Sequence, residues 1–157
     1  MSVNHHGSLI LTGDRGIFIT GRSGSGKTGL ALALLRHCVA HGHFGRLVAD
    51  DQVFLFARNG RLIGRAPAAI SGLVEARGFG PALLDYEPTA VIDLLVELVP
   101  AQAAPRYQEI ATTLLENVEV PTVRLAEHNT DGAIWAIAAH LSLPPFGPGV
   151  IKPSKSV

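Results

Sequence analysis

A glycine-rich segment near the N-terminus carries the residues best suited to chemistry. It fits the pattern G-x-x-x-x-G-K-[ST] at every required position, with the members Gly21, Arg22, Ser23, Gly24, Ser25, Gly26, Lys27 and Thr28. In such a loop the backbone N–H groups surround phosphate oxygens at a helix N-terminus, where the helix dipole also favours negative charge. We expect Lys27 to reach the β- and γ-phosphates of ATP and Thr28 to place its hydroxyl on Mg²⁺. The alternative is a flexible glycine turn that caps an ordinary helix.

Two adjacent carboxylates, Asp50 and Asp51, follow an apolar run and form a second candidate group. Phosphoryl transfer needs one carboxylate for the metal ion and usually another to accept the proton of the nucleophile. A strand ending at these residues is expected to lie parallel beside the strand before the loop, with both carboxylates at the edge where α/β sheets bind ligands. Adjacent strand residues point to opposite faces, so we expect one to face an acceptor hydroxyl and the other the metal or a neighbouring strand. The alternative is a turn or helix cap after a strand.

Two further sites have weaker support. Glu75 and Arg77 share a face if the chain is extended there, and the alternative is a surface ion pair. His6 precedes the first expected strand near a terminus, a region that is often disordered, so a solvated histidine is the simpler interpretation.

The elements expected to position these residues alternate between strands and helices. Asn59-Gly60 predicts a hairpin, Pro67 starts a short helix and 78–81 is a loop. Strands are expected at 8–11, 16–20, 46–51, 53–57, 62–65, 90–99 and 118–125, and helices after the loop and at 131–141, the latter capped by Thr130 or Asp131. This pattern predicts an α/β fold with a single P-loop domain over 1–143 and a flexible tail over 144–157.

Composition excludes several classes. Thirteen Lys and Arg balance thirteen Asp and Glu without a basic run, so neither nucleic acid nor an anionic membrane is an expected partner. The single cysteine, Cys38, excludes a disulfide framework and is expected to be a core thiol. No signal peptide or membrane-spanning run is found, so we expect a cytoplasmic protein.

The loop, the run Leu47-Val48-Ala49-Asp50-Asp51, then Ala66-Pro67 and Glu75-Ala76-Arg77-Gly78 resemble the bacterial HPr kinase/phosphorylase family over about residues 6–125. The resemblance implies a P-loop catalytic domain with a mixed sheet that transfers phosphate from ATP to a serine of an HPr-like phosphocarrier protein, in regulation of a phosphotransferase system. Many members also run the reverse phosphorolysis, and members are typically hexamers. A start just before His6 resembles the family's short form, which lacks a separate N-terminal domain.

The resemblance also implies roles for individual residues. Asp51 is the base that takes the serine proton, and Lys27 contacts the transferred phosphate. Thr28 and Glu75 hold Mg²⁺, with Asp50 beside them. His6 matches the family's histidine before the first strand, and Arg106 corresponds most closely to a later arginine that faces the phosphate.

Some residues depart from the family pattern. Pro81 stands where the family continues with an apolar strand, and Ala126-Glu127-His128-Asn129 replaces its P-G-R-N loop, so the resemblance supports the kinase reaction better than phosphorolysis. Arg124 lies close by in sequence and could substitute for the missing arginine.

Two other functions stay open. A P-loop small-molecule kinase usually closes an arginine-bearing lid over the phosphates, and residues 80–105 contain no arginine. A nucleotide-binding regulator without catalysis is expected to lose the base, but both aspartates are present.

Overall fold

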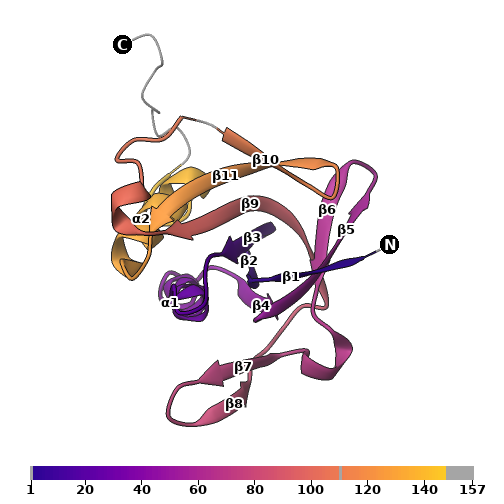
Figure 1. Ribbon diagram of the computed structural model, residues 1–157. Helices are drawn as coiled ribbons and strands as arrows, with labels where there is room; N and C mark the ends of the chain where they lie inside the picture. The colour runs from indigo at the N-terminus through magenta and orange to yellow at the C-terminus, as the bar shows by residue number, and fades with distance from the viewer. Residues whose placement is uncertain (1, 110, 148–157) are drawn as a thin grey trace.

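One long strand, β9 (Thr89–Val99), organises the molecule (Figure 1). The structure, a computed structural model, describes residues 2–109 and 111–147 of the 157-residue chain. β9 pairs with β6 (Arg61–Arg65) through its first residues and runs parallel to both β3 (Arg15–Thr20) and β11 (Val118–Ala126) through the rest. Its continuous apolar run therefore marks a central strand with neighbours along its whole length.

The remaining strands complete a nine-stranded sheet, which is mixed, as the family resemblance implies. The main path runs β1-β5-β6-β9-β3-β2-β4, and β10 joins through β11. The bounds of these further strands are β1 Val3–His6, β2 Ser8–Thr12, β4 Gly45–Ala49, β5 Gln52–Arg58 and β10 Ala111–Leu115. β2 and β3 form one hairpin, and β5 and β6 form another across Asn59-Gly60, which confirms the hairpin predicted there.

One predicted strand neighbour is wrong. β4 is parallel to β3 in direction but does not lie beside it, because β2 is inserted between them and pairs antiparallel with both. β2 can occupy this place because nearly all of it is buried, so it is an interior strand. The carboxyl ends of β3 and β4 still meet at the same edge of the sheet.

Two helices cover one face of the sheet (Figure 1). α1 (Lys27–Ala40) and α2 (Thr130–Leu141) pack with β3, β9 and β11 around a core that includes Ile19, Leu34 and Ile137. Cys38 lies in this region as predicted, and burial raises the pKa of its thiol. The predicted cap of α2 is wrong, because the Asn129 side chain accepts the N–H of Gly132 and Thr130 is already helical.

A small hairpin stands apart from the main sheet (Figure 1). Its strands are β7 (Leu73–Ala76) and β8 (Gly80–Leu83), preceded by the short 3-10 helix η1 (Ala68–Ile70) that Pro67 introduces. The predicted loop at 78–81 is wrong for Gly80 and Pro81, which are in β8. A proline is tolerated there because this two-stranded sheet has no further strand to bond.

A second 3-10 helix, η2 (Ala101–Ala103), follows β9.

The last described residues contact both helices. Beyond α2, the carbonyl of Pro144 lies 2.6 Å from His37 Nε2 and the Phe146 ring packs edge-on against Trp135. The remainder of the predicted flexible tail, residues 148–157, lies outside the described residues. No helix in the ranges 2–109 and 111–147 is long and apolar enough to cross a membrane.

Candidate active site

The glycine-rich loop joins β3 to α1, so the predicted strand, loop and helix arrangement is confirmed. Gly24 and Gly26 have φ angles of 79° and 98°, a left-handed conformation that residues with a Cβ rarely adopt. Gly26 is the N-cap of α1, and the first turn has neither a side-chain cap nor an acidic residue. The first N–H groups of the helix are therefore available to an anion held by the loop.

Two polar side chains inside the loop fit a phosphate chain. Lys27 Nζ donates to the carbonyl oxygens of Gly21 and Arg22 at 2.9 and 3.2 Å, which keeps the ammonium group at the loop. The hydroxyl of Ser25 is buried and has no hydrogen-bond partner. A buried donor without a partner is uncommon and suits a site that receives a polar ligand.

An ion pair ties the loop to the segment between β11 and α2. Arg22 donates through Nε and Nη2 to the two carboxylate oxygens of Glu127, both at 2.8 Å. These hydrogen bonds and the charge of Glu127 raise the pKa of Arg22. Sequence reasoning missed this partner, although Glu127 lies in the segment 126–129 that departs from the family pattern.

Asp50 lies next to the loop and bonds directly to it. It is only 8% exposed, and the Thr28 hydroxyl donates to its two carboxylate oxygens at 3.0 and 3.2 Å. A second hydroxyl, that of Ser8 on β2, donates to Asp50 Oδ1 at 2.6 Å. The predicted association of Thr28 with Asp50 therefore has a direct geometric basis.

Asp51 turns toward the same cavity as Asp50, which the strand argument did not predict. β4 ends at Ala49, and Asp51 has a left-handed backbone with a φ of 70°, so the alternation of strand side chains no longer applies. The Asp51 side chain is 75% exposed, and its Oδ1 lies 4.0 Å from His6 Nδ1. His6 ends β1, which pairs with β5, so its neighbourhood is an ordered strand and not a disordered terminus.

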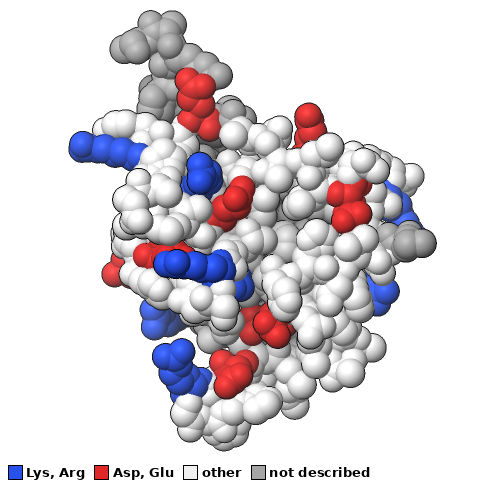
Figure 2. All heavy atoms as spheres, in the orientation of Figure 1, with Lys and Arg blue, Asp and Glu red and all other residues white. Residues whose placement is uncertain are grey.

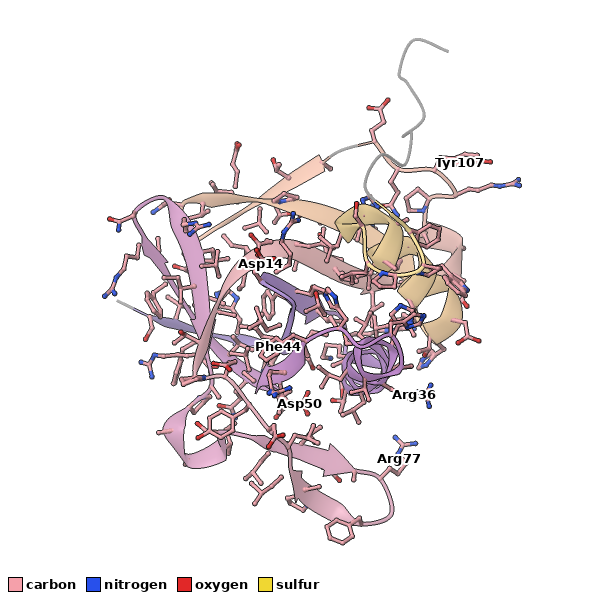
Figure 3. All side chains as sticks on the ribbon, turned by 180° about the vertical axis from the view of Figure 1, so that it is seen from behind. Asp14, Arg36, Phe44, Asp50, Arg77 and Tyr107 are labelled. Carbon is pink, nitrogen blue, oxygen red and sulfur yellow. The ribbon has the colours of Figure 1, made fainter. Side chains whose placement is uncertain are left out.

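The hairpin forms the opposite wall of this cavity. A cavity of about 340 Å³ is lined by Thr28, Asp50, Asp51, Ile70, Leu73, Val74, Glu75 and Pro81. Figure 3 shows Asp50 between α1 and the β7-β8 hairpin. Glu75 is in the extended strand β7, as predicted, and in the described part of the chain no ion pair joins it to Arg77. Four of the predicted residues thus meet at one cavity.

The predicted arginines lie elsewhere. Arg106 follows η2, and its guanidinium is 5.6 Å from the ring centroid of Tyr107, which Figure 3 shows well away from Asp50. Arg124 is exposed on β11, where its N–H donates to the Gln108 side chain. Figure 3 places Arg77 on the turn of the hairpin, on the same side of the molecule as Asp50.

Charged side chains of both signs are mixed on the surface. Figure 2 shows acidic and basic side chains interspersed over one face, without a large area of a single sign.

Metal binding at the cavity would need phosphate oxygens as well as protein ligands. Among the described residues, no group of three or more His, Cys, Asp or Glu side chains could hold a metal ion. Mg²⁺ needs no such group, because it is commonly bound by one or two carboxylates together with phosphate oxygens and water.

These features define a protein of the P-loop class: a glycine loop at the uncapped start of a helix, a mixed α/β sheet and carboxylates beside the loop. The sequence model of the HPr Serine kinase C-terminal domain matches residues 1–129, so the chain belongs to that family. The family resemblance seen in the sequence is thereby confirmed.

Individual relatives agree with this assignment. The chain is 45% identical over 132 residues to HPr kinase/phosphorylase of Limosilactobacillus reuteri, covering 75% of this chain and 39% of the relative. It is 43% identical over 93 residues to HPr kinase/phosphorylase of Clostridium tetani, covering 57% of this chain and 28% of the relative. The chain therefore spans well under half the length of these curated relatives.

A solved structure has the same fold. The HPr(Ser) kinase/phosphatase from Coxiella burnetii superposes with a TM-score of 0.75 at 24% sequence identity, covering 89% of this chain and 97% of that one. At this identity the likeness establishes the architecture.

Proposed function

We propose that this chain is an ATP-dependent serine kinase domain that phosphorylates an HPr-like phosphocarrier protein, in regulation of a phosphotransferase system. One observation carries the proposal: Thr28 of the glycine loop, Asp50, Asp51 and Glu75 line a single cavity. A phosphate-binding loop next to a buried carboxylate and an exposed carboxylate has the parts that phosphoryl transfer requires. The names of the relatives support the same activity.

The surroundings of each residue support its role in this proposal. Lys27, held at the loop, contacts the phosphate that is transferred, and bound ATP supplies that phosphate. Thr28, Asp50 and Glu75 hold Mg²⁺, which neutralises phosphate charge when bound. Asp51 is exposed and has room to accept the proton of a serine hydroxyl as that oxygen attacks the terminal phosphorus. His6, whose Nδ1 lies 4.0 Å from Asp51 Oδ1, orients that carboxylate.

The later arginine of the proposal, Arg106, does not line the cavity. Arg106 lies away from the cavity, so its contact with phosphate requires movement of its segment or the site of another protomer. Assembly into a hexamer, implied by the family resemblance, would offer the second route. Phosphorolysis is proposed as a reverse reaction that uses the same Asp51.

A protein acceptor fits the open character of the cavity. Asp51 is largely exposed, and the hairpin wall carries exposed Phe79 and Leu83. A small-molecule kinase would enclose its acceptor to exclude water. Among the described residues, the wall opposite the loop consists of this hairpin and of Ile70 at the end of η1.

A transfer assay tests the proposal. The purified chain is incubated with ATP and Mg²⁺ and with an HPr-type phosphocarrier, a set of small hydroxyl metabolites, or no acceptor, and phosphate is located by mass spectrometry. The proposal expects phosphate on a serine of the phosphocarrier. Phosphate on a metabolite would identify a small-molecule kinase, and nucleotide binding without any transfer would identify a non-catalytic regulator.

A further inference from the structure

A buried serine outside the cavity bonds to the candidate metal carboxylate. Ser8 begins β2, is 0% exposed and donates its hydroxyl to Asp50 Oδ1 at 2.6 Å. Its neighbours on the strand, Leu9 and Ile10, are core residues. Because Ser8 does not reach the cavity surface, it cannot touch a substrate and can act only through Asp50.

The bonds to Asp50 constrain the Thr28 hydroxyl as well. A hydroxyl has one proton and two lone pairs, and Thr28 directs its proton to Asp50. The lone pairs of Thr28 are then left for a cation in the cavity. Ser8 donates to the same carboxylate oxygen, Asp50 Oδ1, from a strand that is paired on both edges.

The corner formed by residues 6–8, between β1 and β2, also contacts Asp51. Gly7, between β1 and β2, donates its N–H to the carbonyl of Asp51 at 3.1 Å. The residues 6–8 thus contact both aspartates, through the side chain of Asp50 and the backbone of Asp51. This corner is fixed by β1, β2 and β5, so it forms a rigid support for the two carboxylates.

We propose that Ser8 is a positioning residue that fixes the Asp50 carboxylate so that Thr28 presents its oxygen to Mg²⁺. The inference rests on the proposed function, because it assumes Mg²⁺-dependent nucleotide binding at the loop. Groups that orient the ligands of a metal ion commonly change metal affinity about 10- to 100-fold when they are removed. A merely structural hydrogen bond would change protein stability without changing the response to Mg²⁺.

The test is the binding of a fluorescent ATP analogue by the full chain across a Mg²⁺ titration, with a parallel measurement in EDTA. Ser8→Ala is expected to raise the Mg²⁺ concentration for half-maximal binding by about 10-fold or more. Binding in EDTA should stay as in the wild type. Ser8→Cys keeps a similar volume but has a weak donor, so it should shift in the same direction and replaces Ser8→Ala if that variant does not fold.

Two further variants separate positioning from general loosening. Ser8→Thr retains the hydroxyl and should titrate close to the wild type. Thr12 is 1% exposed on the same strand and donates to the Arg15 carbonyl at 3.4 Å, so Thr12→Val removes a matched buried hydroxyl and should not shift the titration. Wild-type titrations for folded Ser8→Ala and Ser8→Cys, or an equal shift for Thr12→Val, would overturn the inference. If the wild type itself binds no nucleotide, the proposed function fails instead.

Discussion

Asp50 and Asp51 are neighbours in sequence with very different surroundings. Asp50 is nearly buried and accepts hydrogen bonds from two hydroxyls, whereas the Asp51 side chain is mostly in solvent near His6. A fixed carboxylate suits a metal ligand or its support, and an accessible carboxylate suits proton transfer to an incoming acceptor. The proposed division of roles between the two aspartates rests on this difference.

Lys27 is the residue whose loss should stop the reaction. Its ammonium group donates hydrogen bonds to two carbonyl oxygens of the loop, so the positive charge lies at the expected phosphate site. Lys27→Ala is expected to abolish measurable phosphoryl transfer while the circular dichroism spectrum stays native, because the transferred phosphate loses its counter-charge. Near-native turnover in the folded variant would contradict the phosphate-loop assignment.

Glu75 tests the contribution of the hairpin to metal binding. Glu75→Gln removes a negative charge from the cavity wall and should raise the Mg²⁺ concentration for half-maximal activity by about 10-fold. Asp85→Asn is the matched control, because Asp85 follows the same hairpin, is exposed and does not line the cavity. If both variants titrate like the wild type, Glu75 is only a surface charge.

Gly7 is the single residue that joins β1 to β2, so a substitution there affects how two strands meet. A Cβ at this position would lie 2.6 Å from the Ile19 carbonyl oxygen and 2.5 Å from the Phe18 ring. Gly7→Ala is therefore expected to destabilise the fold by about 1–3 kcal/mol, measured by urea unfolding. It should also weaken transfer, because the same residue bonds to Asp51.

Gly29 provides the comparison for this prediction. It lies in α1, and a Cβ there would meet no atom within 4 Å. Gly29→Ala should leave stability unchanged or raise it by up to about 1 kcal/mol, because alanine has the higher helix propensity. Equal urea midpoints for the two variants would contradict the prediction, because they would mean that the neighbours of Gly7 make room for a Cβ without loss of stability.

Local signals predicted those elements that local residues determine. The loop at 21–28, the Asn59-Gly60 turn and the apolar run of β9 were all identified correctly. The sequence did not predict that β2 separates β3 from β4, because strand neighbours depend on contacts between distant segments. The short strands β1 and β10 were missed since they are largely exposed and lack an apolar run.

The site was predictable in its residue types more than in its geometry. Thr28, Asp50, Asp51 and Glu75, the residues that the resemblance groups, line one cavity, and their roles stay predictions. Asp51 adopts a left-handed backbone that no local sequence pattern indicates. The sequence around Ser8 is typical of a strand and does not indicate the hydrogen bond from its hydroxyl to Asp50. Polar contacts between residues far apart in sequence are visible only in three dimensions.

At the scale of the whole molecule, the fold supports a shared site edge. β3 and β4 end at one edge of the sheet, where the loop lies, and the β7-β8 hairpin stands apart from the sheet (Figure 1). Residues of the loop, of the segment after β4 and of the hairpin line the cavity together. The same architecture extends over nearly all of the Coxiella burnetii chain. The proposed phosphoryl transfer would therefore depend on the main sheet and the hairpin together.

The central claim is that this cavity transfers phosphate to a serine hydroxyl with Asp51 as the base. The most direct measurement compares wild type and Asp51→Asn for phosphocarrier turnover and for ATP dissociation constant in the same preparation. Positioned proton transfer contributes about 10²- to 10⁴-fold, so turnover should fall by that factor while the ATP dissociation constant stays nearly unchanged. Full turnover in Asp51→Asn, or a joint loss of ATP binding and turnover in a folded variant, would contradict the account.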